Sequence, residues 1–235
     1  MTVELQPRGL VKRHVRSFVR RDSRLTAGQQ NAIDSSWDHY GLDPQDNMFD
    51  FESVFANASP VILEIGFGNG ESLARMASDY PHYNFIGIET HKPGVGHLLI
   101  EVARRGLTNV RVYHADTVTI LSQCIQNQSV SGVHVFFPDP WQKRRHHKRR
   151  LINIEFIQQI TDKLCCGGYL FIATDWCDYA KSIQAMLLDE RCLLQELNHP
   201  DQTDIAIPDR PITKFESRGL RLGHEIHEFR FFKQQ

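Results

Sequence analysis

The chain has 235 residues, of which 41% are hydrophobic and 23% are charged, and this fits one large α/β domain or one domain with an appended arm. The composition excludes collagen-like, intrinsically disordered and disulfide-scaffold proteins. No apolar stretch approaches the roughly 18 residues of a membrane-spanning helix, and the start of the chain is too basic for a signal peptide, so we expect a cytoplasmic protein without membrane contact.

The N-terminal extension, residues 1–50, is divided by charge although the net charge of the chain is only −1. Residues 1–24 carry seven Lys or Arg against two acidic residues, and residues 25–63 then hold no Lys or Arg. We therefore expect a basic N-terminal arm and an acidic stretch ahead of a folded domain that spans residues 51–235.

Beyond residue 60, short β-rich runs alternate with helical runs. Strands are predicted at residues 61–65, 84–89, 109–114, 132–137, 169–174, 192–197 and 224–232. Helices are predicted at residues 72–80, 94–105, 117–126, 151–164 and 178–189. This alternation predicts a doubly wound, mostly parallel sheet of seven strands. A long polar loop with three prolines separates the last two strands, and a structureless loop of such length is usually functional.

The first predicted strand ends in an acidic, glycine-rich turn that contains Glu64, Gly66, Gly68 and Gly70. Ligands of doubly wound sheets bind beyond the carboxyl ends of the strands, so this turn is a candidate ligand site. Dinucleotide binding requires a third glycine where this chain has Glu71, and no Gly-Lys pair is present for a phosphate loop. The turn instead suits a ligand with an amino group and no phosphate, and S-adenosylmethionine is such a ligand.

The next two strands also lead to carboxylates, Glu89 and Asp116. An acidic residue about 20 positions after the glycine turn accepts hydrogen bonds from a ribose diol, and Glu89 has this spacing. Asp116 is a candidate acceptor for the adenine amino group. A helix N-cap or a solvent-facing side chain explains any one strand-end acid, but three in register favour S-adenosylmethionine as the cofactor.

The fourth strand leads into residues 136–141, with the sequence Phe-Phe-Pro-Asp-Pro-Trp, and a basic run from Lys143 to Arg150 follows at once. This run has six permanent positive charges in eight residues. Taken alone, it is either a solvated surface or a contact for nucleic acid.

These motifs, together with Gly-Ile-Glu at residues 87–89 and Arg-Pro-Ile-Thr-Lys-Phe-Glu at residues 210–216, closely resemble the bacterial tRNA (guanine-N7-)-methyltransferase family. The resemblance covers roughly residues 50–235. It implies a Rossmann-like class I methyltransferase fold with an antiparallel last strand. It also implies methyl transfer from S-adenosylmethionine to N7 of a guanine in the variable loop of tRNA. One departure is His227-Glu228, where Trp-Asp is expected in this family.

The resemblance assigns roles residue by residue. The cofactor would be contacted by Glu64, Gly66, Gly68, Gly70, Glu89, Asp116 and Asp139. The substrate would be contacted by Lys143, Asp175, Thr213, Lys214, Phe215 and Glu216. The RNA would be touched by Arg145, His146, His147, Lys148, Arg149 and Arg150. A contact between tRNA and the N-terminal arm rests on charge alone.

The chemistry of N7 methylation needs no strong general base, because guanine N7 carries a free lone pair and loses no proton. Rate should come from in-line positioning and from a carboxylate placed where positive charge develops. Asp139, held between two prolines, is the catalytic candidate, and a simple Pro-Asp-Pro turn is the alternative. The guanine edge offers N–H donors to a carboxylate, for which Asp175 and Glu216 are both candidates. Trp141 or Trp176 is a candidate for stacking on the extracted base, although a core position suits either residue.

Two other functions compete with this interpretation. A class I methyltransferase acting on a small molecule or a protein would keep the cofactor site but would not explain the basic run. A non-catalytic RNA-binding subunit would have a degraded cofactor turn, whereas here its acids and glycines are in place. No partner helix or long hydrophobic edge is evident, so we expect activity from the single chain, as a monomer or homodimer, without an obligate protein partner.

Cysteine and histidine patterns predict no disulfide framework and no metal site. The five cysteines are odd in number and include no Cys-x-x-Cys. The nearest metal-like pattern joins His224 and His227 at i,i+3, whereas a metalloprotease helix requires His-Glu-x-x-His.

Overall fold

The computed structural model describes residues 24–44, 48, 50–189, 194–199 and 205–234, and for Lys214 and Phe215 it describes the backbone alone. Most of the expected basic arm, residues 1–23, lies outside the described residues. Its contact with tRNA therefore stays a prediction.

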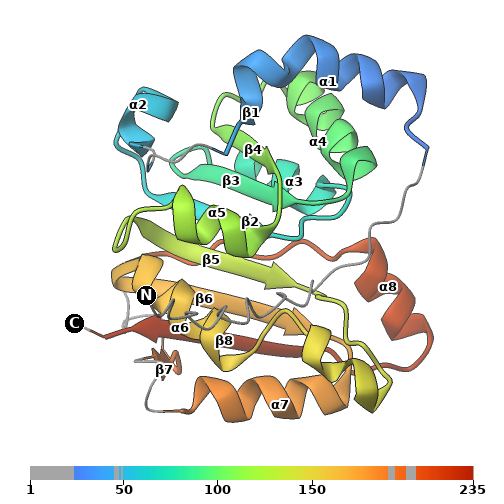
Figure 1. Ribbon diagram of the computed structural model, residues 1–235, viewed down its shortest axis with the longest axis vertical. Coiled ribbons are helices and arrows are strands. Elements are labelled where there is room, and N and C mark those ends of the chain that lie inside the picture. The colour runs from blue at the N-terminus through green and yellow to red at the C-terminus, as the bar shows by residue number, and fades with distance from the viewer. Residues whose placement is uncertain (1–23, 45–47, 49, 190–193, 200–204, 235) are drawn as a thin grey trace, which may run out of the picture.

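The described residues form an eight-stranded sheet in the order β1-β4-β3-β2-β5-β6-β8-β7 (Figure 1). Its strands are β1 (Gly41–Leu42), β2 (Val61–Ile65), β3 (Asn84–Glu89), β4 (Val110–His114), β5 (Val130–Phe136), β6 (Leu164–Thr174), β7 (Leu194–Glu196) and β8 (His227–Lys233). Strands β1 to β6 pair in parallel, and β8 runs antiparallel to both β6 and β7. The predicted doubly wound, mostly parallel sheet with an antiparallel last strand is thus confirmed, with eight strands instead of seven.

Helices cover both faces of the sheet. They are α1 (Ala27–Tyr40), α2 (Phe51–Phe55), α3 (Glu71–Asp79), α4 (Lys92–Arg105), α5 (Thr117–Gln123), α6 (Ile154–Lys163), α7 (Cys177–Leu187) and α8 (Lys214–Arg221), with a short 3₁₀ helix η1 (Arg144–Arg149). Side chains of α5, α6 and α7 pack in one core layer, and those of α1, α3 and α4 pack in the other. Successive strand residues alternate between the two layers because side chains point to opposite faces of a strand. None of the described helices is both long and apolar enough to traverse a membrane.

Part of the acidic stretch is built into the fold. Thr26 and Gln29 form a capping box that begins α1, a local signal that satisfies two otherwise unpaired backbone N–H groups. Helix α1 packs so closely on α4 that a Cβ atom on Gly96 would lie 2.8 Å from the Cβ of Gln29. The helix ends at β1, where Gly41 pairs with Val112 of β4 and supplies the additional strand.

The expectation of a structureless loop before the last strand is wrong for residues 214–221, which form α8. Thr213 caps this helix, and Thr213 and Glu216 form a capping box. The helix was missed because its residues have little apolar content from which a periodicity could be read. The Thr-x-x-Glu spacing was the available signal.

The segment that leads to α8, residues 205–212, crosses the sheet before the helix begins (Figure 1). Two tyrosines hold it: the hydroxyl of Tyr83 donates to the carbonyl of Ala206 at 2.9 Å, and the backbone N–H of Asp209 donates to the hydroxyl of Tyr80 at 3.0 Å. This anchoring fixes where Arg210 and α8 lie relative to the carboxyl ends of the strands.

Candidate active site

The carboxyl ends of adjacent parallel strands bring the predicted acids to one edge of the sheet. Glu64 and Glu89 lie at the ends of β2 and β3, and Asp116 follows β4 as the N-cap of α5. Asp139 follows β5, and Asp175 follows β6. In a doubly wound sheet this edge is where ligands bind, so the structure gathers the predicted cofactor and substrate acids where chemistry is expected.

The turn after β2 is open toward solvent. Gly66, Gly68 and Gly70 have φ angles of 71°, 61° and 74°, a left-handed conformation that glycine adopts without steric cost. A Cβ atom on Gly66 or Gly68 would meet no heavy atom within 4 Å. Helix α3 begins directly after Gly70, so the turn presents its backbone and a helix start to a ligand.

Glu64 is buried, and one of its carboxyl oxygens has no hydrogen-bond partner among the described residues. The residue is 3% exposed, and this oxygen is Oε2. Burial raises the pKa of Glu64 to about 8, because desolvation disfavours the charged form. A ligand that brings a cationic group to this position supplies the missing partner. Together with the open glycine turn, this arrangement fits the amino group of S-adenosylmethionine.

Glu89 connects β3 to the glycine turn. Its Oε2 accepts a hydrogen bond from the backbone N–H of Gly68 at 2.9 Å, and its Oε1 accepts from the backbone N–H groups of Thr90 at 2.6 Å and His91 at 2.9 Å. Asp116 accepts from a backbone N–H in the first turn of α5 at 2.9 Å. The hydroxyl of Thr90 also donates to Glu89 Oε1, at 3.3 Å, so the acceptor capacity that Glu89 keeps for a ligand lies on Oε2, which accepts one hydrogen bond. Asp116 also keeps acceptor capacity, since each carboxylate oxygen has two lone pairs.

The turn that carries Asp139 is bracketed by two residues in unusual conformations. Phe137 has a φ of 51° and Trp141 a φ of 45°. Left-handed non-glycine residues are uncommon, cost free energy, and cluster at functional sites. The backbone N–H of Phe137 donates to the carbonyl of Ala173 in β6 at 2.8 Å. The turn is thereby fixed to the sheet while Asp139 itself is exposed.

The basic run after this turn is mostly exposed. Lys143, Arg145 and Lys148 face solvent. The guanidinium of Arg149 lies over the ring of Trp141, 4.9 Å from its centroid, which holds η1 against the turn through a cation–π contact.

Arg150 differs from the rest of the run because it is buried. Its Nε donates to the carbonyl of Pro140 at 2.9 Å, and its Nη2 donates to Asp178 Oδ2 at 2.6 Å. The ring of Tyr179 lies 4.6 Å from the guanidinium. The structure therefore gives Arg150 partners within the protein, whereas the sequence predicted an RNA contact.

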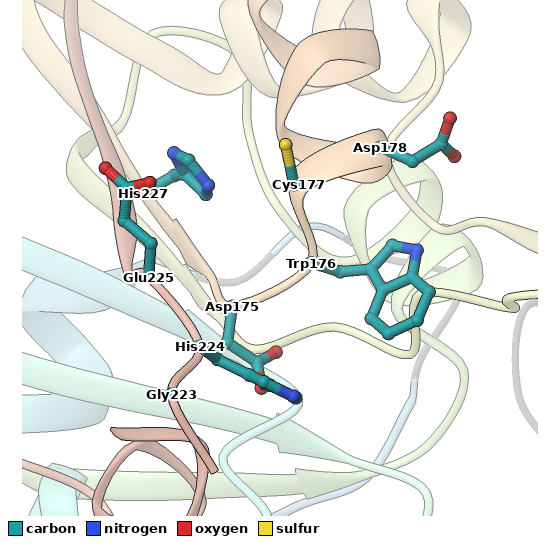
Figure 2. A pocket seen from close by; sticks show the side chains of 8 residues that line it. All are labelled: Asp175, Trp176, Cys177, Asp178, Gly223, His224, Glu225 and His227. Atoms are coloured by element: carbon teal, nitrogen blue, oxygen red, sulfur yellow. The ribbon is translucent and has the colours of Figure 1, made fainter. Parts of the chain in front are cut away.

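A pocket of about 350 Å³ lies between the start of α7 and the segment that precedes β8 (Figure 2). Asp175 and His224 point toward one another on its wall, with 3.0 Å between Asp175 Oδ2 and His224 Nδ1. Gly219 of α8 packs against the same carboxylate, since a Cβ atom there would lie 3.0 Å from Asp175 Oδ2. Within the described ranges, no three His, Cys, Asp or Glu side chains gather as metal ligands would.

Glu216, the second candidate for the guanine edge, is engaged inside the protein. Both of its carboxylate oxygens accept from the guanidinium of Arg210, at 2.9 Å for Nη2 to Oε1. Arg210 also donates to Glu228 Oε1 at 2.7 Å, and its guanidinium lies 5.3 Å from the centroid of the Phe137 ring. The hydrogen bond from Arg210 lowers the pKa of Glu216. Glu216 thus anchors Arg210 and α8 beneath the Asp139 turn.

Comparison with known proteins now decides the family. A family model described as “Putative methyltransferase” matches residues 58–229. The tRNA (guanine-N(7)-)-methyltransferase of Alkalilimnicola ehrlichii is 46% identical, over 95% of this chain and 94% of that protein. That of Hydrogenovibrio crunogenus is 47% identical, over 94% of this chain and 91% of that protein. The chain belongs to the tRNA (guanine-N(7)-)-methyltransferase family.

Membership in the tRNA (guanine-N(7)-)-methyltransferase family confirms the resemblance of the motifs. Solved structures of other methyltransferases share this fold. The crystal structure of the 16S rRNA methyltransferase KamB matches with a TM-score of 0.54 at 13% identity, over 80% of this chain and 95% of that chain. Such a likeness at low identity shows the class I methyltransferase fold alone.

Two features of this tRNA (guanine-N(7)-)-methyltransferase family member escaped the sequence analysis. Arg210 lay within a quoted motif but was given no role, and its ion pairs with the buried Glu216 and the more exposed Glu228 make it the centre of a charged cluster. The unexpected Glu at position 228 has a clear function, because its carboxylate reaches Arg210. His224 was considered only as a metal ligand, and nothing in its local pattern indicated the contact with Asp175.

Proposed function

We propose that the chain transfers a methyl group from S-adenosylmethionine to N7 of a guanine in the variable loop of tRNA. The observation that carries this proposal is the pairing of two features on neighbouring strands. The end of β2 holds an unpartnered buried carboxylate beside an open glycine turn, and the end of β5 holds an exposed Asp139 followed by the basic run. Membership in the family supports both assignments.

S-adenosylmethionine, when bound, supplies a methyl group on a positively charged sulfur. Glu64 would hold its amino group, because an ammonium relieves the cost of the buried carboxylate. Glu89 would accept from its ribose hydroxyls and Asp116 from its adenine amino group. The open space over Gly66 and Gly68 would admit the ligand close to the backbone.

Asp139 would act electrostatically and by positioning. Positive charge develops on the purine as the methyl group arrives, and a carboxylate fixed nearby stabilises that charge. The left-handed residues on both sides of the Pro-Asp-Pro turn and the hydrogen bond from Phe137 to β6 hold Asp139 in place without reorganisation. No proton has to move, since guanine N7 offers a free lone pair.

Asp175 is the residue that we assign to the guanine edge. It faces the pocket and has only a partial set of partners, and His224 orients one of its oxygens. Its second oxygen remains to accept N–H groups of the base. Glu216 is a weaker candidate because both of its oxygens accept from Arg210.

The exposed part of the basic run would contact RNA phosphates. Arg150 is left out of this set because its guanidinium is buried and paired. If the remaining five Lys and Arg of the run each neutralise one phosphate, the logarithm of tRNA affinity falls with the logarithm of salt with a slope of about −3.5 to −4.5. Such an enzyme would act in the cytoplasm without a second kind of subunit.

The test is methyl transfer from labelled S-adenosylmethionine to unmodified bulk tRNA, with nucleoside analysis of the product. The purified chain is expected to form N7-methylguanosine, and Asp139→Ala to lose about 10²- to 10³-fold in kcat while cofactor affinity is retained. Tight cofactor binding without tRNA labelling would contradict the proposal and favour a small-molecule or protein substrate. Activity that appears only after cell extract is added would contradict the single-chain assignment.

A further inference from the structure

The end of α8 exposes apolar side chains that the fold does not use. Of the five large hydrophobic residues most exposed in the described part of the chain, three lie within residues 212–222. They are Ile212, Leu220 and Leu222, with 71%, 51% and 64% exposure. Such a concentration in one short segment is typical of an interaction surface, whereas scattered single exposures are ordinary.

The charges of α8 are divided between its two faces. Among the residues of α8 whose burial is described, Glu216 and Gly219 are the buried ones, and they contact Arg210 and Asp175. Arg218 and Arg221 are three residues apart and share the opposite, exposed face. Neither guanidinium forms an ion pair with a carboxylate of the described residues. Arg221 donates from Nε to the carbonyl of Ser217 at 3.1 Å, and both guanidinium groups keep their positive charge. Two exposed arginines beside exposed leucines form a surface that is both cationic and apolar.

This surface continues directly into the pocket. The chain leaves α8 at Leu222 and enters the pocket wall at Gly223 and His224. Figure 1 shows α8 on one side of the carboxyl ends of β5 and β6, and the segment of the basic run on the other side, near the start of α7. A nucleic acid that reaches the pocket from the basic run therefore meets α8 as it continues.

We infer that the exposed side chains at the end of α8, namely Arg218, Leu220, Arg221 and Leu222, form a second RNA-contact surface across the pocket from the basic run. This inference rests on the proposed function and identifies how the tRNA is held at that same site. Arg218 and Arg221 pair with phosphates, for which the planar guanidinium is well suited. Leu220 and Leu222 contact the bases that are left unstacked when the target guanine is withdrawn from the tRNA.

RNA fits this surface better than a protein partner does. The exposed end of α8 carries two arginines, and the only acid within residues 213–222 is the buried Glu216; such one-sided positive charge suits the phosphate backbone of RNA. The position beside the pocket supplies the second argument, because α8 packs on the carboxylate of Asp175, so a base placed against Asp175 lies next to this helix.

The experiment measures tRNA affinity against salt concentration for the full chain with S-adenosylhomocysteine present. The double variant Arg218→Gln/Arg221→Gln is expected to bind tRNA about tenfold more weakly, and its salt slope to be smaller in magnitude by about 1.4 to 1.8. The control is Arg104→Gln/Arg105→Gln, which removes the same charge from the last turn of α4, at the far ends of the strands. The control is expected to keep the wild-type slope.

The variant Leu220→Ser/Leu222→Ser tests the apolar contacts. It is expected to lose tRNA affinity without a change in salt slope, with an unchanged melting temperature and cofactor affinity. A wild-type slope in the arginine variant would overturn the inference. So would a change of oligomeric state in the leucine variant with unchanged tRNA binding, which identifies a second copy as the occupant. If the wild-type chain forms no N7-methylguanosine but the α8 variants still lose tRNA affinity, the proposed reaction fails and the RNA surface stands.

Discussion

Arg150 and Asp178 form an ion pair with 2.6 Å between Nη2 and Oδ2, and this pair fixes the end of the basic run, next to the turn that carries Asp139, to the start of α7. The Arg150 side chain is 7% exposed, and its Nε donates to the carbonyl of Pro140, next to Asp139. A guanidinium held in this way cannot also reach an RNA phosphate. Its effect on the reaction is therefore expected to pass through the position of Asp139.

Arg150→Lys should lower kcat and leave the salt dependence of tRNA binding unchanged. Lysine keeps the charge but cannot donate to Pro140 and Asp178 in the same planar geometry. Misplacement of a catalytic group by about 1 Å costs up to 10²-fold in rate, so a loss of tenfold or more is expected. The measurement is steady-state kinetics with salt-dependent tRNA binding.

Arg145→Gln is the matched comparison, because Arg145 is exposed in the same run. This variant should raise the KM for tRNA and reduce the magnitude of the salt slope by about 0.7 to 0.9, with kcat preserved. If Arg150→Lys instead changes the slope and not kcat, the assignment of Arg150 as a positioning residue is wrong.

The buried carboxyl of Glu64 should make the ligand-free protein less stable as pH rises. Its pKa is raised from 4.5 to about 8 by burial, so between these values the folded state binds a proton that the unfolded state has released. The free energy of unfolding then falls by up to about 1.4 kcal/mol per pH unit across this window. Chemical denaturation at pH 5 and pH 8 measures the difference, and Glu64→Gln should abolish it.

The same group predicts the pH dependence of cofactor binding. The carboxylate form of Glu64 is the one that pairs with an ammonium, so the affinity for S-adenosylmethionine should rise as pH increases from 6 toward 8. Titration calorimetry on wild type and Glu64→Gln tests this, and the variant should bind weakly with a flat profile over that range. A steep profile in the variant would assign the titration to another group.

Gly219→Ala should lower the activity without lowering the stability of the protein. Alanine is favoured over glycine within a helix by up to about 1 kcal/mol, but the new Cβ would lie 3.0 Å from Asp175 Oδ2. The carboxylate must shift, so kcat/KM should fall while the melting temperature holds or rises. Gly28→Ala in α1 is the control, because a Cβ there meets nothing within 4 Å. Equal activity of both variants would argue against a role of Asp175 in binding the base.

Asp175→Asn should lose activity, whereas Glu216→Gln should lose stability. The asparagine variant should lose tRNA turnover with little change in stability, because Asp175 is partly exposed and faces the pocket. Glu216→Gln removes one of the two carboxylates that pair with Arg210, whose side chain is 5% exposed. Breaking a buried pair outright costs about 3 to 5 kcal/mol, and a smaller loss is expected here because Glu228 still accepts from Arg210. Thermal unfolding together with kinetics distinguishes the two. A stable, inactive Glu216→Gln would reverse our assignment of the guanine edge.

Local patterns in the sequence were sufficient for the sheet and for the edge of the sheet at which the strand-end acids gather. Residues 61–65 and 84–89 were predicted as strands and form β2 and β3 with those limits, because fully buried parallel strands appear as short apolar runs between turns. The positions of the glycine turn and the strand-end acids were predictable from the same strands, because both follow directly where the strands end. Helices α1 and α8 were missed since their sequences carry little apolar periodicity, although each begins with a capping box.

The sequence by itself determined the fold class, the family and the edge of the sheet where the candidate site residues gather. Only the tertiary structure decided which charged residues remain available there. Arg150 is paired with Asp178, 28 residues further along the chain, and Glu216 is paired with Arg210. Neither side chain is therefore available to a substrate. Ion pairs of this kind depend on how elements pack, and a run of like charges looks the same whether its last member is solvated or buried.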